Sequence, residues 1–155
     1  ISDQLEQDLA SNRFVTAFVG IVDAGKDQVR YHSAGQAPIL HFRAASRTCA
    51  TLGPTAPPLG LLSPLLLSDA IVVEMEPGDI LAAMTDGVFE STDPEDVEFG
   101  VEGVERFLAE RHADDLPALV ESLHAAVRDH RRGAPPDDDT TIVLVRRVAE
   151  ERSSG

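Results

Sequence analysis

The sequence contains no tryptophan, and aromatic side chains make up only 5% of its 155 residues. Sugar-binding surfaces usually stack rings against such side chains, so their scarcity disfavours a carbohydrate-active protein. Basic residues are also few, because 13 Lys and Arg stand against 27 Asp and Glu and leave a formal net charge of −14. A field of that sign repels nucleic acid and anionic lipid, so we expect neither a nucleic acid nor a membrane as a partner.

Cysteine occurs once, at Cys49, which excludes an internal disulfide and fits a reducing, cytoplasmic location. Cys49 lies in an alternation of apolar and polar residues, which favours a packed, unreactive thiol. No apolar run approaches the roughly 20 residues that a membrane-spanning helix needs. The N-terminal residues Ile1-Ser2-Asp3-Gln4 have neither a signal-peptide pattern nor a starting Met, so we expect a segment of a longer protein.

Most of the first half of the chain has the pattern of short strands. Residues 14–22 are apolar almost throughout and rich in β-branched and aromatic side chains, which predicts a strand buried on both faces. The polar segment 23–27 predicts a turn, and the alternation that follows it predicts a second strand and a hairpin. We expect a central strand at 80–84, a strand with one wetter face at 71–75 and others at 39–42 and 48–52.

The second half of the chain has helical periodicity along two segments, with Asp114 or Asp115 as a candidate N-cap of the second. An apolar segment at 141–145 then predicts another buried strand. This order of strands, helices and a strand indicates an α+β fold, with residues 1–149 in one domain and 150–155 as a frayed tail. The apolar faces of the two helices consist of Val101, Val104, Phe107 and Leu108, and of Leu116, Leu119, Val120, Leu123 and Val127.

Two groups of acidic residues lie at the ends of predicted buried strands. Asp86 follows strand 80–84, and Asp137, Asp138 and Asp139 precede strand 141–145. If the two strands are antiparallel neighbours, the end of one meets the start of the other and the carboxylates converge. Clustered carboxylates repel one another unless a cation joins them, and Mg²⁺ or Mn²⁺ prefers oxygen ligands of this kind.

Two other interpretations of these acidic residues stay open from the pattern alone. Aspartate and glycine are common in ordinary turns, which need no ligand. A carboxylate pair also serves glycoside hydrolysis, although the scarcity of aromatic side chains disfavours that reaction.

A series of short motifs extends the argument over nearly the whole chain. In order, they are Arg13-Phe14-Val15-Thr16-Ala17-Phe18, Ser33-Ala34-Gly35-Gln36-Ala37-Pro38, Pro58-Leu59-Gly60-Leu61, Glu76-Pro77-Gly78-Asp79-Ile80-Leu81, Thr85-Asp86-Gly87-Val88-Phe89-Glu90, Glu98-Phe99-Gly100 and Asp137-Asp138-Asp139-Thr140-Thr141. Each motif is weak alone, but in this order the chain resembles the SpoIIE/RsbU branch of the protein phosphatase 2C (PPM) superfamily of metal-dependent serine/threonine phosphatases. The resemblance implies a β-sandwich flanked by helices, incomplete at its N-terminus, with residues 1–149 as the C-terminal part of the domain.

The resemblance also implies roles for individual residues. Asp86 matches the metal ligand of the family's Thr/Ser-Asp-Gly motif, and Asp138 matches a ligand in its Asp-Asp-x-Thr motif. Asp139 matches a neighbouring polar position, a weaker or indirect ligand, whereas Asp137 is expected to face solvent. Gly87 would make the turn sharp and keep the site open.

Two departures from the family pattern bear on activity. The family has an aspartate that bridges both metal ions, followed by Gly-His-Gly, and this sequence starts after the place for it. Gln36 stands where the family usually has histidine. With two or three carboxylates for ions that each take about six oxygens, we expect weak metal binding and poor activity from this chain alone.

The resemblance implies a reaction without a protein nucleophile, in which two Mn²⁺ or Mg²⁺ ions bind a phosphoserine or phosphothreonine and activate a water molecule. It implies a phosphorylated anti-anti-sigma (STAS-type) protein as substrate, a place in sigma-factor regulation and an upstream sensor domain. A non-catalytic protein-interaction module (pseudophosphatase) of the same fold is the alternative. In either case, strand edges left uncovered would favour self-association.

Overall fold

The computed structural model describes residues 4–5, 13–62, 64–136 and 138–149. The expected tail at 150–155 lies outside the described residues. The chain divides into two compact units, which are described separately below. Unit 1 consists of Ile1–Ile39 and Thr51–Met75, and unit 2 consists of Leu40–Ala50 and Glu76–Gly155. Two antiparallel sheets and a set of helices make up the described residues, so the α+β prediction is confirmed.

Unit 1 is built around a three-stranded sheet in the order β1-β2-β5. Strand β1 (Ala17–Asp23) pairs antiparallel with β2 (Gln28–Ala34), which confirms the predicted hairpin. Strand β5 (Ile71–Glu74) pairs antiparallel with the other edge of β2 and alternates in burial, as expected of a strand with one wetter face. The central strand β2 buries Val29 and Tyr31, so its alternating side chains form the apolar side of this sheet.

The prediction that residues 14–22 form a strand buried on both faces is wrong. Strand β1 begins at Ala17, and Val19 and Ile21 are each 67% exposed while Val22 is 60% exposed. The physical reason is position in the sheet, because β1 is an edge strand with β2 as its neighbour on one side. An apolar run indicates a strand that suits burial, but burial depends on what packs against it.

Unit 2 contains a four-stranded sheet in the order β4-β3-β6-β7, made by β3 (Ile39–Arg43), β4 (Thr48–Leu52), β6 (Ile80–Met84) and β7 (Ile142–Arg146). Two residues of β4 and one of β3 fall in unit 1 by the division above. Strand β6 is central and almost wholly buried, as its continuous apolar sequence predicts. Strand β7 was expected to be buried, but it is an edge strand with Val143 52% exposed.

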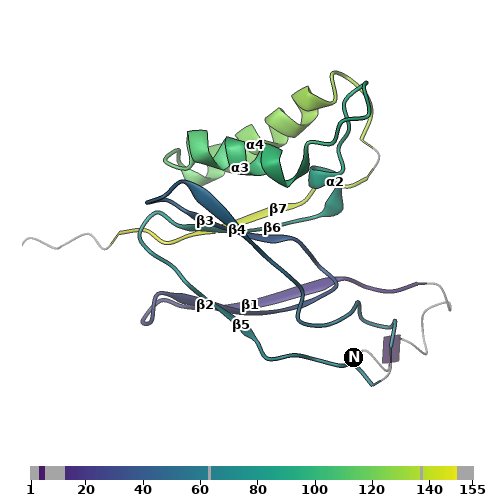
Figure 1. The fold of residues 1–155 in the computed structure, drawn as a ribbon, viewed down its shortest axis with the longest axis vertical. Helices are drawn as coiled ribbons and strands as arrows, with labels where there is room; N and C mark the ends of the chain where they lie inside the picture. The colour runs from purple at the N-terminus through teal and green to yellow at the C-terminus, as the bar shows by residue number, and fades with distance from the viewer. Residues whose placement is uncertain (1–3, 6–12, 63, 137, 150–155) are drawn as a thin grey trace, which may run out of the picture. The chain divides into compact units, whose positions relative to one another are not determined.

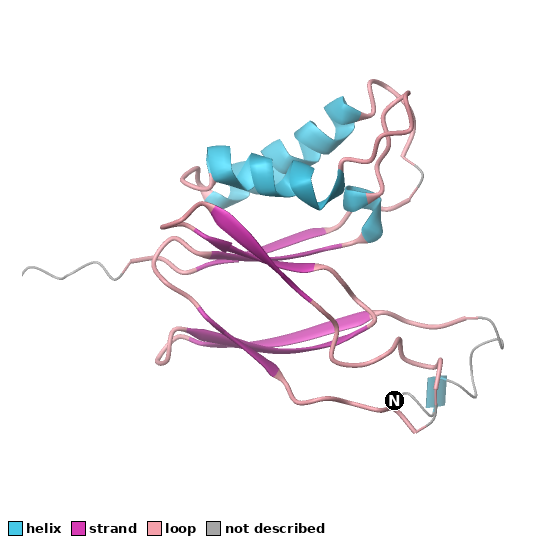
Figure 2. Ribbon diagram, viewed as in Figure 1, coloured by secondary structure: helices cyan, strands magenta, loops and turns pink. Residues whose placement is uncertain are grey.

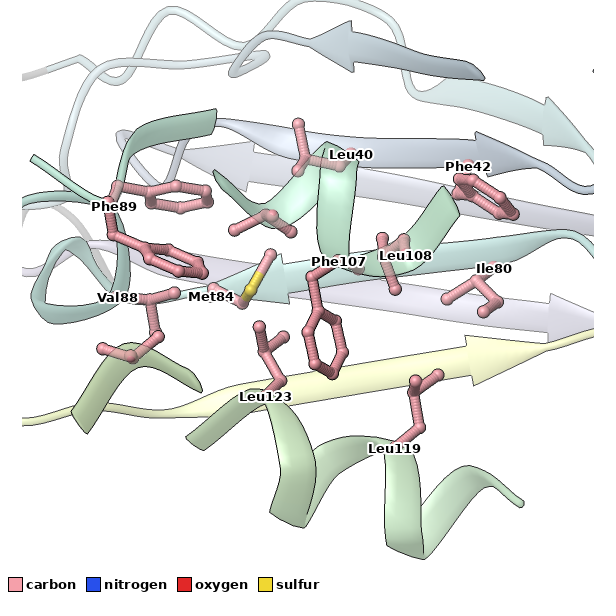
Figure 3. Close-up of a cluster of buried hydrophobic side chains, with 14 residues drawn as sticks. Leu40, Phe42, Ile80, Met84, Val88, Phe89, Phe107, Leu108, Leu119 and Leu123 are labelled. Carbon is pink, nitrogen blue, oxygen red and sulfur yellow. The ribbon is translucent and has the colours of Figure 1, made fainter. Parts of the chain in front are cut away.

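Helices α3 (Gly100–Arg111) and α4 (Leu116–His130) cover one face of this four-stranded sheet (Figure 1). Their buried side chains recur at helical spacing, including Val104 and Leu108 on α3 and Leu119 and Leu123 on α4, so the predicted apolar faces are confirmed. These side chains pack with Ile80 and Met84 of β6 in one cluster (Figure 3). Burying a side chain of this size stabilises the fold by about 1.5–3 kcal/mol.

A buried contact between His41 and Asp79 lies at the start of β6. His41 on β3 lies 3.1 Å from Asp79, measured from Nε2 to Oδ2, and both side chains are buried. The backbone N–H groups of Ala44 and Glu76 also donate to the Asp79 carboxylate, at 2.9 and 3.0 Å. Asp79 therefore joins β3 to the turn before β6, a role that the sequence pattern, which predicts only a tight turn there, does not reveal.

Candidate active site

The two acidic groups meet because β6 and β7 are antiparallel neighbours. Met84, the last residue of β6, lies opposite Ile142, the first residue of β7. The residues that follow Met84 therefore lie beside those that precede Ile142, as the sequence predicts for such a pair of strands. Asp86 begins the short helix α2 (Asp86–Phe89) rather than standing in an open turn. Val88 and Phe89 of the same helix are buried in the apolar core of unit 2 and so anchor α2 there.

Contacts between backbone and side-chain atoms hold the two segments together. The Thr85 hydroxyl donates to the Asp139 carbonyl at 2.9 Å and accepts from the Thr141 N–H at 2.8 Å. The Thr85 N–H donates to the Thr141 carbonyl at 3.1 Å. The backbone beside Asp86 and the backbone of the loop carrying Asp138 and Asp139 are therefore in direct contact.

Gly87 is where the two segments approach most closely. A Cβ added to it would lie 2.5 Å from the Asp139 carbonyl oxygen and 3.1 Å from that of Asp138. Gly87 lies inside α2, and its φ is not positive. Glycine is needed here for space rather than for the sharp turn expected from the sequence.

The carboxylates of Asp86, Asp138 and Asp139 are all exposed to solvent. The Asp139 N–H donates to Asp138 Oδ1 at 2.7 Å, which orients the Asp138 side chain within its own loop. Asp137 lies outside the described residues. An exposed pair of acidic segments in backbone contact is a position where a divalent cation would relieve repulsion.

The chemistry of these side chains fits Mg²⁺ or Mn²⁺, because hard divalent cations take carboxylate oxygens. Their number falls short of a complete site. Within the described ranges there is no group of three His, Cys, Asp or Glu residues placed to hold a metal ion. Asp86, Asp138 and Asp139 are therefore candidate ligands for part of one coordination shell, and weak binding by this chain alone stays a prediction.

Three other motifs of the series, at residues 13–18, 33–38 and 58–61, lie in unit 1. Gly35 has a φ of +73°, and a Cβ there would lie 2.5 Å from the Pro58 ring, so the two motifs that contain them pack together. The Thr55 hydroxyl and backbone bond to the backbone of buried Ser33. Gln36, at the position of the family histidine, is half-buried, and its Oε1 accepts from the Thr16 hydroxyl at 3.4 Å.

The acid-rich loop from Asp93 to Glu98 is well bonded. Asp93 accepts hydrogen bonds from the N–H groups of Glu95 and Val97 through Oδ1. These bonds, with the nearby Arg132 guanidinium, hold the pKa of the Asp93 carboxyl below its usual range. Arg132, just past α4, also donates to both Glu95 carboxylate oxygens at 2.9 Å. The charge of this loop is thus partly matched by its own neighbours.

Thr85 is the residue that the sequence analysis missed. Its position in the Thr85-Asp86-Gly87 motif was noted, but its hydroxyl was given no role. The available signal was a hydroxyl residue directly before a short helix, which normally suggests an N-cap.

Comparison with known proteins identifies one family whose model matches nearly the whole chain. The model of the family "Stage II sporulation protein E (SpoIIE)" matches residues 1–148. No match was found among curated proteins. None of the helices in the described part of the chain has the length and apolar character needed to cross a membrane.

Solved structures share the fold at low sequence identity. The SpoIIE phosphatase domain of Bacillus subtilis, from a Mn-presoaked crystal, matches with a TM-score of 0.67 at 20% identity, over 87% of this chain and 57% of that chain. The SiaA PP2C domain of Pseudomonas aeruginosa matches with a TM-score of 0.74 at 21% identity, over 95% of this chain and 57% of that chain. The RsbU and RsbW domains of a Mycobacterium tuberculosis protein match with a TM-score of 0.70 at 21% identity, over 96% of this chain and 40% of that chain.

This chain therefore spans a little over half the length of the SpoIIE and SiaA domains that it matches. The matches to PP2C phosphatase domains confirm the expected fold. Because the family model covers nearly the whole sequence, the chain belongs to the family "Stage II sporulation protein E (SpoIIE)".

Proposed function

We propose that this chain is part of a metal-dependent protein serine/threonine phosphatase that dephosphorylates a regulatory protein. The observation that carries the proposal is the backbone contact between the Asp86 segment and the Asp138–Asp139 loop at the meeting ends of β6 and β7. This contact joins the backbone segments that carry these exposed carboxylates, which come from two distant parts of the sequence. Membership of a family with phosphatase domains, one of them from a Mn-presoaked crystal, supports the same reading.

In this proposal Asp86 and Asp138 hold one Mn²⁺ or Mg²⁺ ion. The hydrogen bond from the Asp139 N–H to Asp138 Oδ1 would orient the Asp138 carboxylate, whose oxygens still have lone pairs for a cation. Asp139 contributes as a weaker or indirect ligand. When bound, the metal would supply positive charge for a phosphate group and lower the pKa of a water molecule. Gly87 leaves room for the loop, and buried Val88 and Phe89 anchor the helix that begins at Asp86.

We further propose a phosphorylated anti-anti-sigma (STAS-type) protein as substrate, in the cytoplasm, with a sensor domain upstream in the full protein. The structural likeness to a protein with RsbU and RsbW domains supports a regulatory protein as partner. The net charge of −14 argues against nucleic acid or an acidic membrane surface in that role.

Calorimetric titration with Mn²⁺ tests the metal site. We expect weak binding by the unmodified chain that Asp86→Asn and Asp138→Asn each abolish, because each variant removes one charge and one ligand. Asp96→Asn is the matched control, since it removes the same charge from an exposed loop residue outside the site. Equal binding in all four proteins would contradict the proposal.

The non-catalytic alternative needs a second measurement, because a pseudophosphatase can also keep carboxylates. Hydrolysis of a phosphoserine peptide should depend on Mn²⁺ and on both Asp86 and Asp138 if the site is catalytic. Metal binding that depends on both residues, without any turnover even when upstream sequence is restored, would favour the interaction module.

A further inference from the structure

Thr85 occupies the N-cap position of α2, but its side chain does not cap the helix. A threonine there normally accepts a hydrogen bond from an N–H in the first helical turn. In this structure the hydroxyl turns instead to the neighbouring loop, where it donates to the Asp139 carbonyl and accepts from the Thr141 N–H. A hydroxyl can do both at once, because it has one proton to donate and lone pairs that accept.

The Thr85 hydroxyl bonds to the loop because Thr85 lies where the hydrogen-bond ladder between β6 and β7 ends. Thr85 and Thr141 are the next pair after Met84 and Ile142, and the Thr85 N–H donates to the Thr141 carbonyl as a ladder pair should. Hydrogen-bonded partners in an antiparallel pair exchange two such bonds. The return bond from the Thr141 N–H goes to the Thr85 hydroxyl, because the Thr85 carbonyl accepts from the Val88 N–H at 3.0 Å and so starts α2.

We infer that Thr85 is a positioning residue, whose hydroxyl fixes the Asp138–Asp139 loop against the Asp86 segment and so sets the spacing of their carboxylates. The role of this carboxylate spacing in metal binding rests on the proposed function. The contact of the Thr85 hydroxyl with the loop rests on the structure alone. The hydroxyl replaces the backbone acceptor that the strand loses when the helix begins. One residue thereby ends β6, starts α2 and holds the loop.

Gly87 limits the same contact from the other side. A side chain there would meet the Asp139 carbonyl oxygen, the atom to which the Thr85 hydroxyl donates. The Thr85 hydroxyl thus bonds to the loop, and the lack of a side chain at Gly87 leaves room for it. Thr85 and Gly87 together allow the loop to lie against the Asp86 segment through contacts made by the protein itself.

Three variants of the full chain test the role of Thr85. Thr85→Val keeps the shape and removes both hydrogen bonds, whereas Thr85→Ser keeps the hydroxyl and removes only a methyl group. Thr92→Val is the matched control, because Thr92 is half-buried like Thr85 and lies outside the contact with the Asp138–Asp139 loop. The measurements are amide hydrogen exchange at Thr141 without metal and the Mn²⁺ affinity by calorimetry.

We expect Thr85→Val to speed exchange of the Thr141 amide about tenfold or more and to weaken Mn²⁺ binding about tenfold, since one hydrogen bond is worth about a factor of ten. Thr85→Ser and Thr92→Val should stay within about threefold of the unmodified chain on both measurements, less than half of that free energy. If Thr85 had only a structural role, Thr85→Val would lower thermal stability without speeding amide exchange specifically at Thr141. Thr85→Ser would then not restore the unmodified behaviour.

The Thr141 exchange measurement and the Mn²⁺ titration test this inference and the proposed function separately. If the unmodified chain binds no Mn²⁺ but Thr85→Val exposes the Thr141 amide, the positioning contact stands and the proposed metal site fails. Unchanged Thr141 exchange in Thr85→Val overturns the inference, and so does unchanged Mn²⁺ affinity in a chain that does bind. If Thr85→Val does not fold, Gly87→Ala displaces the same loop with the hydroxyl intact, and unaltered Thr141 exchange there would equally overturn it.

Discussion

The two units of this chain differ in how much apolar surface they bury. Unit 2 packs two helices on its sheet around one cluster, in which Ile80, Leu108, Leu119 and Leu123 are wholly inaccessible to solvent. In the described part of unit 1, buried apolar side chains are fewer and come from β2, β5 and the segments around them. Among the described residues, the exposed large apolar side chains of unit 1 are Phe14, Val15, Val19, Ile21, Val22, Leu61, Leu62, Leu66, Leu67 and Val72, against Val97, Val143 and Val148 in unit 2.

This difference shows that similar apolar strand patterns lead to different burial in the two units. Both contain apolar strands, but unit 2 also supplies the helices that cover its sheet. Exposed apolar patches of this kind mark surfaces that meet another protein surface. The chain spans only part of the SpoIIE and SiaA domains that it matches, and those longer domains hold residues with no counterpart here.

The largest effect should come from the unit 2 core. Leu123→Ala should lower the free energy of unfolding by about 2–5 kcal/mol, because it leaves a cavity at a fully buried position. Urea unfolding measures this loss. The same substitution at Leu66, which is 70% exposed in unit 1, should change stability by less than about 0.5 kcal/mol. Similar losses in both variants would erase the contrast between the units.

A smaller effect is expected at the contact of α2 with the Asp138–Asp139 loop. Gly87→Ala should cost about 1–3 kcal/mol of unfolding free energy, because its Cβ would lie 2.5 Å from the Asp139 carbonyl oxygen. Gly53→Ala in unit 1 is the control, since a Cβ there meets no atom within 4 Å. Thermal unfolding of both variants gives the comparison, and a neutral Gly87→Ala would mean that the loop moves freely.

Charge on β1 should alter association more than stability. We expect the unmodified chain to self-associate through this exposed edge strand, and Val19→Lys to reduce that association, because lysine protects sheet edges from pairing. Sedimentation velocity measures the change. Val143→Lys adds the same charge to the exposed edge strand of unit 2 and should leave association unaltered. A monomeric unmodified chain would show that the apolar surface of unit 1 does not drive pairing.

The smallest structural effect concerns Cys49 in unit 2. Burial, with a further contribution from the Glu105 charge, raises the pKa of its thiol from 9.0 to about 12. At pH 8 the folded chain should therefore react with a thiol reagent at least about 100 times more slowly than the chain in urea, since the thiolate is the reactive form. Equal labelling rates in the two states would contradict this burial.

The same shift has a defined direction for stability. Because the folded pKa is raised, the protonated thiol contributes fully below pH 9, and its contribution falls as the pH rises from about 9 towards 12. Cys49→Ala should flatten the alkaline decline in stability over that interval, as measured by urea unfolding at successive pH values.

The sequence by itself determined the local elements and the residues of the candidate site. Apolar periodicity located the hairpin, the central strand β6 and both long helices, because spacing along the chain decides which side chains share a face. The motif series gave the family, and the fold matches confirmed it. The roles of Asp86, Asp138 and Asp139 as metal ligands remain predictions.

Only the tertiary structure decided what covers each strand and how the acidic segments are held. The exposure of β1 and β7 depends on their positions at sheet edges, which apolar composition does not encode. The Thr85 hydroxyl contacts a loop that is 54 or more positions away in sequence, and Gly87 leaves room for the same loop. That loop comes near only when β6 and β7 pair. Local pattern specifies elements, whereas contacts between distant segments arise from packing and hydrogen bonding in three dimensions.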